Sequence, residues 1–175
     1  MIRLAHSDDI IQLNQLIEHS ARILSNKNYT AQEIEGAIHA IFGVDKELIN
    51  DQTYYVIEKE GVLVACGGWS KRKTLFGGDQ CKAREEGFLD PKKDYAKIRA
   101  FFVHPDHARQ GLGKKLLEYC EQQALIYGFT KFEMMATLPG AKLYQVCGYQ
   151  IIEPKYFVLP EGHVFKMLKM TKYTM

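Results

Sequence analysis

The sequence predicts a single domain of the α/β class that spans residues 1–175. A chain of 175 residues fits one compact domain comfortably and two only awkwardly. Hydrophobic residues make up 46% of the chain and charged residues 25%, which is close to globular averages and excludes a fibre, a coiled coil or a disordered chain. Segments with strand character and segments with helical periodicity follow one another along the chain, as expected for a mixed fold.

The first part of the chain is predicted to form a strand and two helices. Residues 2–5 are typical of a short strand, and Asp8 or Asp9 can cap the helix that follows. Thr30 and Glu33 have the spacing of a capping box, in which each side chain satisfies the other residue's backbone N–H. We therefore expect a second helix to begin after Thr30.

Two strand-forming segments follow, and then a long irregular one. Residues 53–58 and 62–66 are rich in strand formers, and the short turn at residues 59–61 suits an antiparallel hairpin. Residues 71–94 are rich in Gly, Asp, Lys, Arg and Glu and show little periodicity, which predicts a long surface excursion. Loops of this length are often functional or mobile.

The second half of the chain is predicted to alternate between strands and helices. Residues 97–103 form a strand that ends before Pro105, which cannot continue a ladder. A helix starts after the next two glycines and ends at Gly128. The remaining elements are strands at residues 131–136, 149–152 and 164–170 and a short helix at residues 139–147.

Composition argues against several classes of partner. The formal net charge of +2 is too small to suggest a nucleic-acid or membrane surface. The four cysteines are widely spaced without a Cys-x-x-Cys pair, which indicates neither a zinc site nor a disulfide framework. The longest apolar stretches are far shorter than the roughly 20 residues of a membrane span, and the first residues do not resemble a secretory signal. We expect a cytoplasmic protein with no nucleic-acid or membrane partner.

The connection between the strand at residues 97–103 and the next helix has the chemistry of a phosphate-binding turn. It contains Arg109, Gln110, Gly111, Leu112, Gly113 and Lys114. Backbone N–H groups at a helix N-terminus favour anions, and glycine removes the Cβ that would obstruct a phosphate. Ala108 stands where a Walker loop needs glycine, and Leu116 stands where a dinucleotide fingerprint needs glycine. The spacing therefore excludes these two nucleotide-binding loops and argues against ATP and NAD. A plain turn with solvated basic side chains is the alternative.

This turn and a segment downstream of it share residues with a known family. Phe102-Val103-His104-Pro105, followed by residues 109–114, resembles the acetyl-CoA signature of the GNAT superfamily of N-acetyltransferases. Both glycines match the family pattern, whereas Ala108 occupies the place of its leading Gln or Arg. Residues 141–149 resemble the family's second segment, an Ala-x-x-Tyr helix followed by Gly and an aromatic residue. The resemblance covers nearly the whole chain apart from residues 71–94.

The resemblance implies both a fold and an activity. The fold is a central, mixed but mostly antiparallel twisted sheet of about six or seven strands, flanked by about four helices. The activity is transfer of an acetyl group from acetyl-CoA to a primary amine of a small molecule or a polypeptide, by direct attack through a tetrahedral intermediate. Acetyl-CoA is then a cosubstrate, bound through the pantetheine arm along the strand end at Phe101, Phe102 and Val103 and through the diphosphate at residues 109–114.

The resemblance assigns Tyr144 as the acid that protonates the departing CoA thiolate. A phenol has a reference pKa near 10, close to that of an alkyl thiol, so proton transfer between them is nearly balanced. We expect Leu143, Val146 and Cys147 to face the core, with Tyr144 rotated away by about 100°. A packing or surface tyrosine is the alternative.

Several roles stay open. No carboxylate lies on the strand at residues 97–103, and a water chain could replace any side-chain base. The candidates for the base are Glu58, Glu133, Asp94, His104 and His163. His104 and His107 lack the further ligands that zinc needs, so no metal is expected. Residues 71–73 could border the acceptor pocket, and a homodimer paired through an edge strand such as residues 164–170 is an open expectation. A non-catalytic CoA-binding regulatory module is the competing function.

Overall fold

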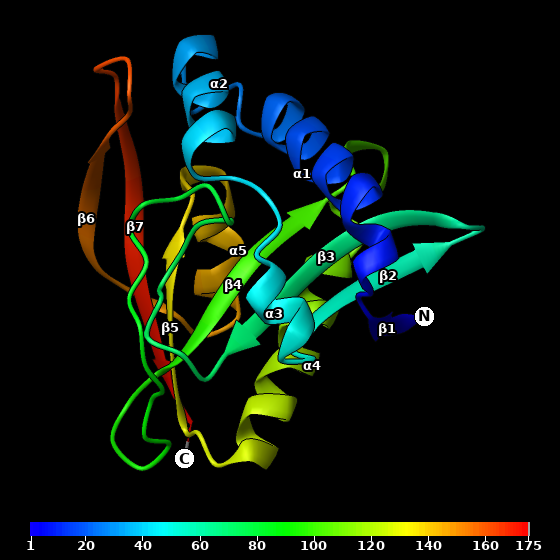
Figure 1. The fold of residues 1–175 in the computed structure, drawn as a ribbon, viewed down its shortest axis with the longest axis vertical. Helices are drawn as coiled ribbons and strands as arrows, with labels where there is room; N and C mark the ends of the chain where they lie inside the picture. Colours follow the sequence, from blue (N-terminus) through cyan, green and yellow to red (C-terminus); the bar gives the residue numbers. More distant parts are fainter. Residues whose placement is uncertain (175) are drawn as a thin grey trace.

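The computed structural model describes residues 1–174, which are built around one seven-stranded sheet (Figure 1). The strands are β1 (Ile2–Leu4), β2 (Tyr54–Lys59), β3 (Val62–Ser70), β4 (Ala96–Val103), β5 (Lys131–Ala136), β6 (Gln150–Val158) and β7 (Val164–Tyr173). Their order is β1-β2-β3-β4-β5-β7-β6, and every neighbouring pair is antiparallel except β4 and β5. The predicted mixed, mostly antiparallel sheet is confirmed. Met175, the last residue of the predicted domain, lies outside the described residues.

Helices cover both faces of this sheet. They are α1 (Ile10–Leu24), α2 (Ala31–Ala40), α3 (Lys46–Asn50), α4 (Leu112–Tyr127) and α5 (Ala141–Val146). Buried residues of α4 and α5 form one apolar core with the sheet, and those of α1, α2 and α3 form a second core on the opposite face (Figure 1). The structure thus adds α3, which is too short to show a periodic pattern, to the helices expected from the sequence. No helix within residues 1–174 is long and apolar enough to cross a membrane.

Local capping explains where two of these helices begin. The capping box of α2 is confirmed: the Glu33 N–H donates to Thr30 Oγ1 at 3.1 Å, and the Thr30 N–H donates to Glu33 Oε1 at 2.8 Å. Asp9 occupies the N-cap position of α1, but its carboxylate accepts hydrogen bonds from Arg3 and from the His6 N–H instead. The sequence therefore predicted the start of α1 correctly and the role of the carboxylate wrongly.

The C-terminal hairpin differs from its prediction. The strand expected at residues 149–152 continues to Val158 and forms the edge of the sheet as β6. β7 pairs with β5 on one side and with β6 on the other, so both of its edges are occupied. The expectation that residues 164–170 offer a free edge to a second subunit is wrong for this reason.

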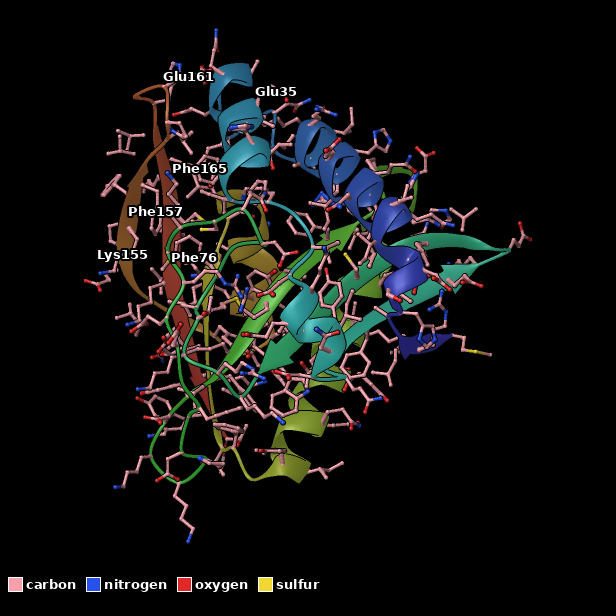
Figure 2. All side chains as sticks on the ribbon, in the orientation of Figure 1. Glu35, Phe76, Lys155, Phe157, Glu161 and Phe165 are labelled. Carbon is pink, nitrogen blue, oxygen red and sulfur yellow. The ribbon has the colours of Figure 1, made fainter. Side chains whose placement is uncertain are left out.

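The predicted surface excursion is present and crosses the face that carries α1, α2 and α3. Between β3 and β4 the chain forms no helix or strand beyond one isolated bridge, Arg72 to Phe88. Phe76 packs on Phe157 of β6 at 4.5 Å between ring centroids, and the two rings lie side by side in Figure 2. The excursion therefore lies between α3 and the C-terminal hairpin.

Candidate active site

The turn before α4 presents a run of backbone N–H groups without protein acceptors. Arg109 (φ 61°) and Gly111 (φ 81°) both adopt the left-handed conformation, and Gly111 is the N-cap of α4. The first backbone bond of the helix runs from the Lys115 N–H to the Gly111 carbonyl at 3.0 Å. Within residues 1–174, no acceptor binds the N–H groups of residues 109–114. Such a turn at a helix N-terminus is suited to an anion.

Side chains play a smaller part in this turn. Arg109, Gln110 and Lys114 are exposed, whereas Leu112 is buried and anchors the first turn of α4. A Cβ at Gly113 would lie 3.0 Å from Leu143 Cδ2, so this glycine allows α4 and α5 to approach closely. The two predicted glycines have different tasks, one conformational and one steric.

β4 separates from β5 next to this turn. The parallel pairing joins only Ala96 to Phe132 and Lys97 to Glu133, and the buried Lys97–Glu133 ion pair of 3.0 Å fixes that end. Further along β4, the pairing with β3 is irregular and Ala100 has φ 54°, with its carbonyl accepting a hydrogen bond from the Tyr54 hydroxyl at 2.9 Å. Residues 98–103 therefore make no strand pairs with β5 within the described part of the chain.

A cleft of about 690 Å³ lies along this separation, which is within the size range of small-molecule sites. We call it the turn cleft, and it runs between the end of α1, the end of β4, the turn and α5. Of the predicted site residues, all except Gln110 line it: Phe101, Phe102, Val103, Arg109, Gly111, Leu112, Gly113, Lys114 and Tyr144. Residues at and just after the end of α1, namely 20, 21 and 23–27, also line it, and sequence reasoning missed them because no motif marks them.

Tyr144 lies at the inner end of the turn cleft. The residue is only 9% exposed, whereas Val146 is 72% exposed, so the prediction was wrong for these two residues. Leu143 and Cys147 are partly buried and pack on the core, as predicted. Burial raises the pKa of the Tyr144 hydroxyl above its usual value, and Cys147 adds to this effect. The hydroxyl makes no hydrogen bond to any of residues 1–174, so its proton is free for a ligand. The phenol therefore stays protonated at neutral pH, as an acid requires.

A second, smaller cavity of about 70 Å³ lies on the other side of Tyr144. We call it the loop cavity because residues 75–78 of the excursion form one of its walls. Five residues line both spaces: Phe42, Phe101, Phe102, Thr137 and Tyr144. The two spaces therefore share part of their walls, and Tyr144 belongs to that shared part.

None of the candidate bases lines either space. Glu133 is paired with Lys97, Glu58 with Arg3, and Asp94 accepts the Asp90 N–H. The remaining two are His104, whose Nδ1 accepts the Asp106 N–H at 3.1 Å, and His163, which lies by α2. Residues 71–73 do not line the loop cavity either. In the part of the chain that the structure describes, no group of three or more His, Cys, Asp or Glu side chains could hold a metal ion.

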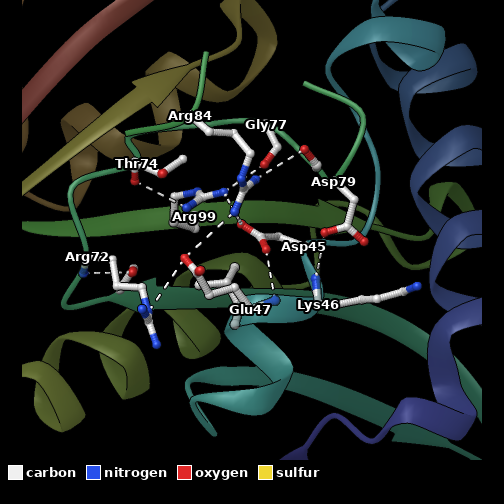
Figure 3. Close-up of polar contacts among 12 residues, drawn as sticks. Asp45, Lys46, Glu47, Arg72, Thr74, Gly77, Asp79, Arg84 and Arg99 are labelled. Carbon is white, nitrogen blue, oxygen red and sulfur yellow. Dashed lines mark hydrogen bonds and ion pairs between the residues drawn. The ribbon is translucent and has the colours of Figure 1, made fainter. Parts of the chain in front are cut away.

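A buried ion-pair network supports the wall of the loop cavity (Figure 3). Arg99 of β4 donates to Asp45 Oδ2 at 2.8 Å and to the Gly77 carbonyl at 2.7 Å, and Arg84 donates to the same Asp45 oxygen at 3.0 Å. The Arg99 and Asp45 side chains are each 1% exposed. Burial lowers the pKa of Arg99, and Asp45 opposes that effect. Sequence reasoning missed this network, because its members lie far apart in the chain.

Comparisons with known proteins agree with this geometry. The model of the acetyltransferase (GNAT) family matches residues 16–149, which is more than half of the chain. A sequence search of curated proteins gave no match. Among solved structures, a GCN5-related N-acetyltransferase from Rhodopseudomonas palustris superposes with a TM-score of 0.74 at 16% identity, over 99% of this chain and 94% of that one.

Two further structures were solved with CoA species. PaiA N-acetyltransferase from Thermoplasma acidophilum, in complex with coenzyme A, gives a TM-score of 0.65 at 12% identity, over 99% of this chain and 98% of that one. YncA from Salmonella typhimurium, with acetyl-CoA, gives a TM-score of 0.64 at 16% identity, over 100% of this chain and 94% of that one. At these identities the likeness shows the fold, and the family model shows the membership. The chain belongs to the acetyltransferase (GNAT) family.

Proposed function

We propose that the protein transfers an acetyl group from acetyl-CoA to a primary amine. The observation that carries this proposal is the position of Tyr144, a buried phenol with a free hydroxyl at the junction of the turn cleft and the loop cavity. Membership of an acetyltransferase family supports the reaction class, and the relatives solved with coenzyme A and acetyl-CoA support the cosubstrate.

In this proposal acetyl-CoA lies in the turn cleft. The N–H groups of residues 109–114 bind the diphosphate, which is consistent with their lack of protein acceptors. The backbone of Phe101, Phe102 and Val103 holds the pantetheine arm where β4 has left β5. The thioester then lies near Tyr144, and the amine approaches from the loop cavity.

The chemistry is direct attack of the amine nitrogen on the thioester carbonyl carbon. A tetrahedral intermediate forms, and its oxyanion accepts a hydrogen bond from the backbone N–H near Phe102 or Val103. The carbon–sulfur bond breaks, the sulfur takes the Tyr144 proton, and the tyrosine recovers a proton from water. Since no carboxylate or imidazole of residues 1–174 lines either space, the nitrogen releases its two protons to water in this proposal. The net products are the acetamide, CoA thiol and one proton.

Replacement of Tyr144 by phenylalanine tests the proposal. Tyr144→Phe should lower kcat for thiol release by about 10²–10⁴-fold, the usual range for a general acid, while the dissociation constant for CoA stays unchanged. Unfolding stability should also stay unchanged, because the hydroxyl has no partner among residues 1–174.

Tyr149→Phe is the matched control. The Tyr149 ring lies 6.2 Å from that of Tyr144, but its hydroxyl donates to Glu121 at 2.7 Å. This variant should lose stability by about 1.5–3 kcal/mol and keep its turnover per folded molecule. Unchanged kcat in Tyr144→Phe would remove the tyrosine from its role. Tight CoA binding without turnover on any amine would instead favour a regulatory CoA-binding module.

A further inference from the structure

The loop cavity is the space available to the acceptor beyond its reacting nitrogen. It meets the turn cleft only along the residues that both spaces share, and Tyr144 is one of them. If the amine reacts beside Tyr144, the rest of the acceptor extends toward residues 75–78 and the start of β4. The chemistry of this cavity therefore selects the acceptor, an inference that rests on the proposed acetyl transfer.

The side chains that line the loop cavity are mostly apolar, although polar atoms contribute a substantial part of its exposed surface. Its large apolar members come from five segments: Ile41, Phe42, Leu75, Phe76, Ile98, Phe101, Phe102, Met134, Met135 and Met167. Three of these are methionines, whose flexible side chains adapt to the shape of an apolar group. Arg99 is the one charged side chain among the described residues that line it.

Arg99 offers little to a charged acceptor. Both terminal nitrogens are already used, Nη1 on the Thr74 carbonyl at 3.2 Å and Nη2 on Asp45 and the Gly77 carbonyl. The Asp45 carboxylate balances the guanidinium charge (Figure 3). Nε has no partner within residues 1–174, but it is buried, so a ligand reaches it only if the wall rearranges. A second charge on the acceptor would therefore enter without a counterion, which is unfavourable.

The loop cavity is also small and well supported. A volume of about 70 Å³ corresponds to about two water molecules, and hence to a group of only a few non-hydrogen atoms. A Cβ at Gly78 would lie 2.7 Å from the Gly43 backbone, so the excursion closes tightly on this side. Gln80 Nε2 donates to the Phe42 carbonyl at 2.7 Å, and Phe157 supports Phe76 from behind.

We propose that the acceptor is a primary amine whose remaining part is a short apolar group without a second charge, and that Phe76 limits its length. Amino acids, polyamines and lysine side chains next to charged residues fit this cavity poorly. Short alkylamines fit it well.

Three amines of equal chain length test the absence of a second charge. Butylamine, 1,4-diaminobutane and 4-aminobutanoate end in a methyl, an ammonium and a carboxylate group. With saturating acetyl-CoA, kcat/KM for butylamine should exceed that for either charged amine by about 100-fold or more. The affinities of the same amines for the CoA-saturated protein, measured by calorimetry, should follow the same order. A charged amine that binds as tightly as butylamine overturns the inference, with or without turnover.

A variant tests the part of Phe76. Phe76→Ala should raise kcat/KM for hexylamine relative to butylamine about tenfold, because two more CH₂ groups become buried, and should leave CoA binding unchanged. An unchanged ratio of the two kcat/KM values would show that Phe76 does not limit the length of the acceptor. If the variant does not fold, the three-amine series on the native chain decides the proposal. If apolar amines bind in the expected order but none is acetylated, the proposed function fails and the acceptor preference stands.

Discussion

The turn cleft and the loop cavity are built from different parts of the polypeptide. In the turn cleft, the groups suited to a ligand are backbone N–H groups of one continuous run, residues 109–114, and no acceptor in the described part of the chain binds them. Around the loop cavity, the polar groups are side chains from distant segments, and Asp45 binds both Arg84 and Arg99. One region keeps its polar groups free for a ligand, whereas the other uses them to hold a wall in place.

The largest expected effect comes from breaking the network at Asp45. Asp45→Asn keeps a good N-cap for α3 but removes the charge that balances Arg99, so an uncompensated guanidinium stays buried. The free energy of unfolding should fall by about 3–5 kcal/mol, measured by urea denaturation.

Glu35→Gln is the control for this prediction. Glu35 also pairs closely with an arginine, Arg22, at 2.7 Å, but both side chains are about half exposed. Its loss should therefore cost less than about 1 kcal/mol. Equally small losses in both variants would show that the network does not hold the wall, and the contrast between the two regions would then disappear.

The pH dependence of turnover tests the junction between the two regions. Because burial raises the pKa of Tyr144 above 10, the acid form persists beyond the pH at which an ordinary tyrosine ionises. The rate should therefore rise with pH as the acceptor loses its proton, and should not fall below about pH 10. A pH–rate profile with the fold monitored at each pH measures this. A falling limb below pH 10 that is absent in Tyr144→Phe would mean that the hydroxyl is not shielded as the structure indicates.

The contrast between a site built from consecutive residues and one built from distant segments also explains what could be predicted from the sequence. The turn at residues 109–114 was recognisable because its conformation depends on consecutive residues, with Gly111 needed for a positive φ and Gly113 for a close approach. The succession of strands and helices along the chain was recognisable because strand formers alternate with helical patterns and clear turns. These features depend on local sequence alone.

Features that depend on tertiary contacts were missed. Asp45 and Arg99 lie in separate elements, and no spacing rule relates them. α5 has only six residues, too few for its apolar pattern to fix an orientation, and the actual inward face is set by the space left where β4 leaves β5. β6 is longer than predicted because it pairs with β7 along its length, and no local pattern in the sequence indicates this pairing. The same pairing occupies the edge of β7 that was expected to be free.

A smaller effect should distinguish backbone conformation from ligand binding in the turn. Gly111 and Gly61 have nearly equal φ values, 81° and 78°, and a Cβ would meet nothing within 4 Å at either position. Gly111→Ala and Gly61→Ala should therefore each cost about 1 kcal/mol of stability. Only Gly111→Ala should weaken CoA binding, by about tenfold, because the N–H groups beside it shift. Equal CoA affinity in the two variants would argue against a backbone site.

The smallest effect is expected for the Arg109 side chain. Arg109 is exposed at the mouth of the turn, where an ion pair with a phosphate is screened by water and salt. Arg109→Ala should weaken CoA binding by less than about 1 kcal/mol, or about fivefold, and the difference should diminish as the salt concentration rises. Titration of CoA at two ionic strengths measures it. A loss larger than that of Gly111→Ala would mean that side chains, and not the backbone, hold the diphosphate. The turn cleft would then resemble the loop cavity in depending on side chains.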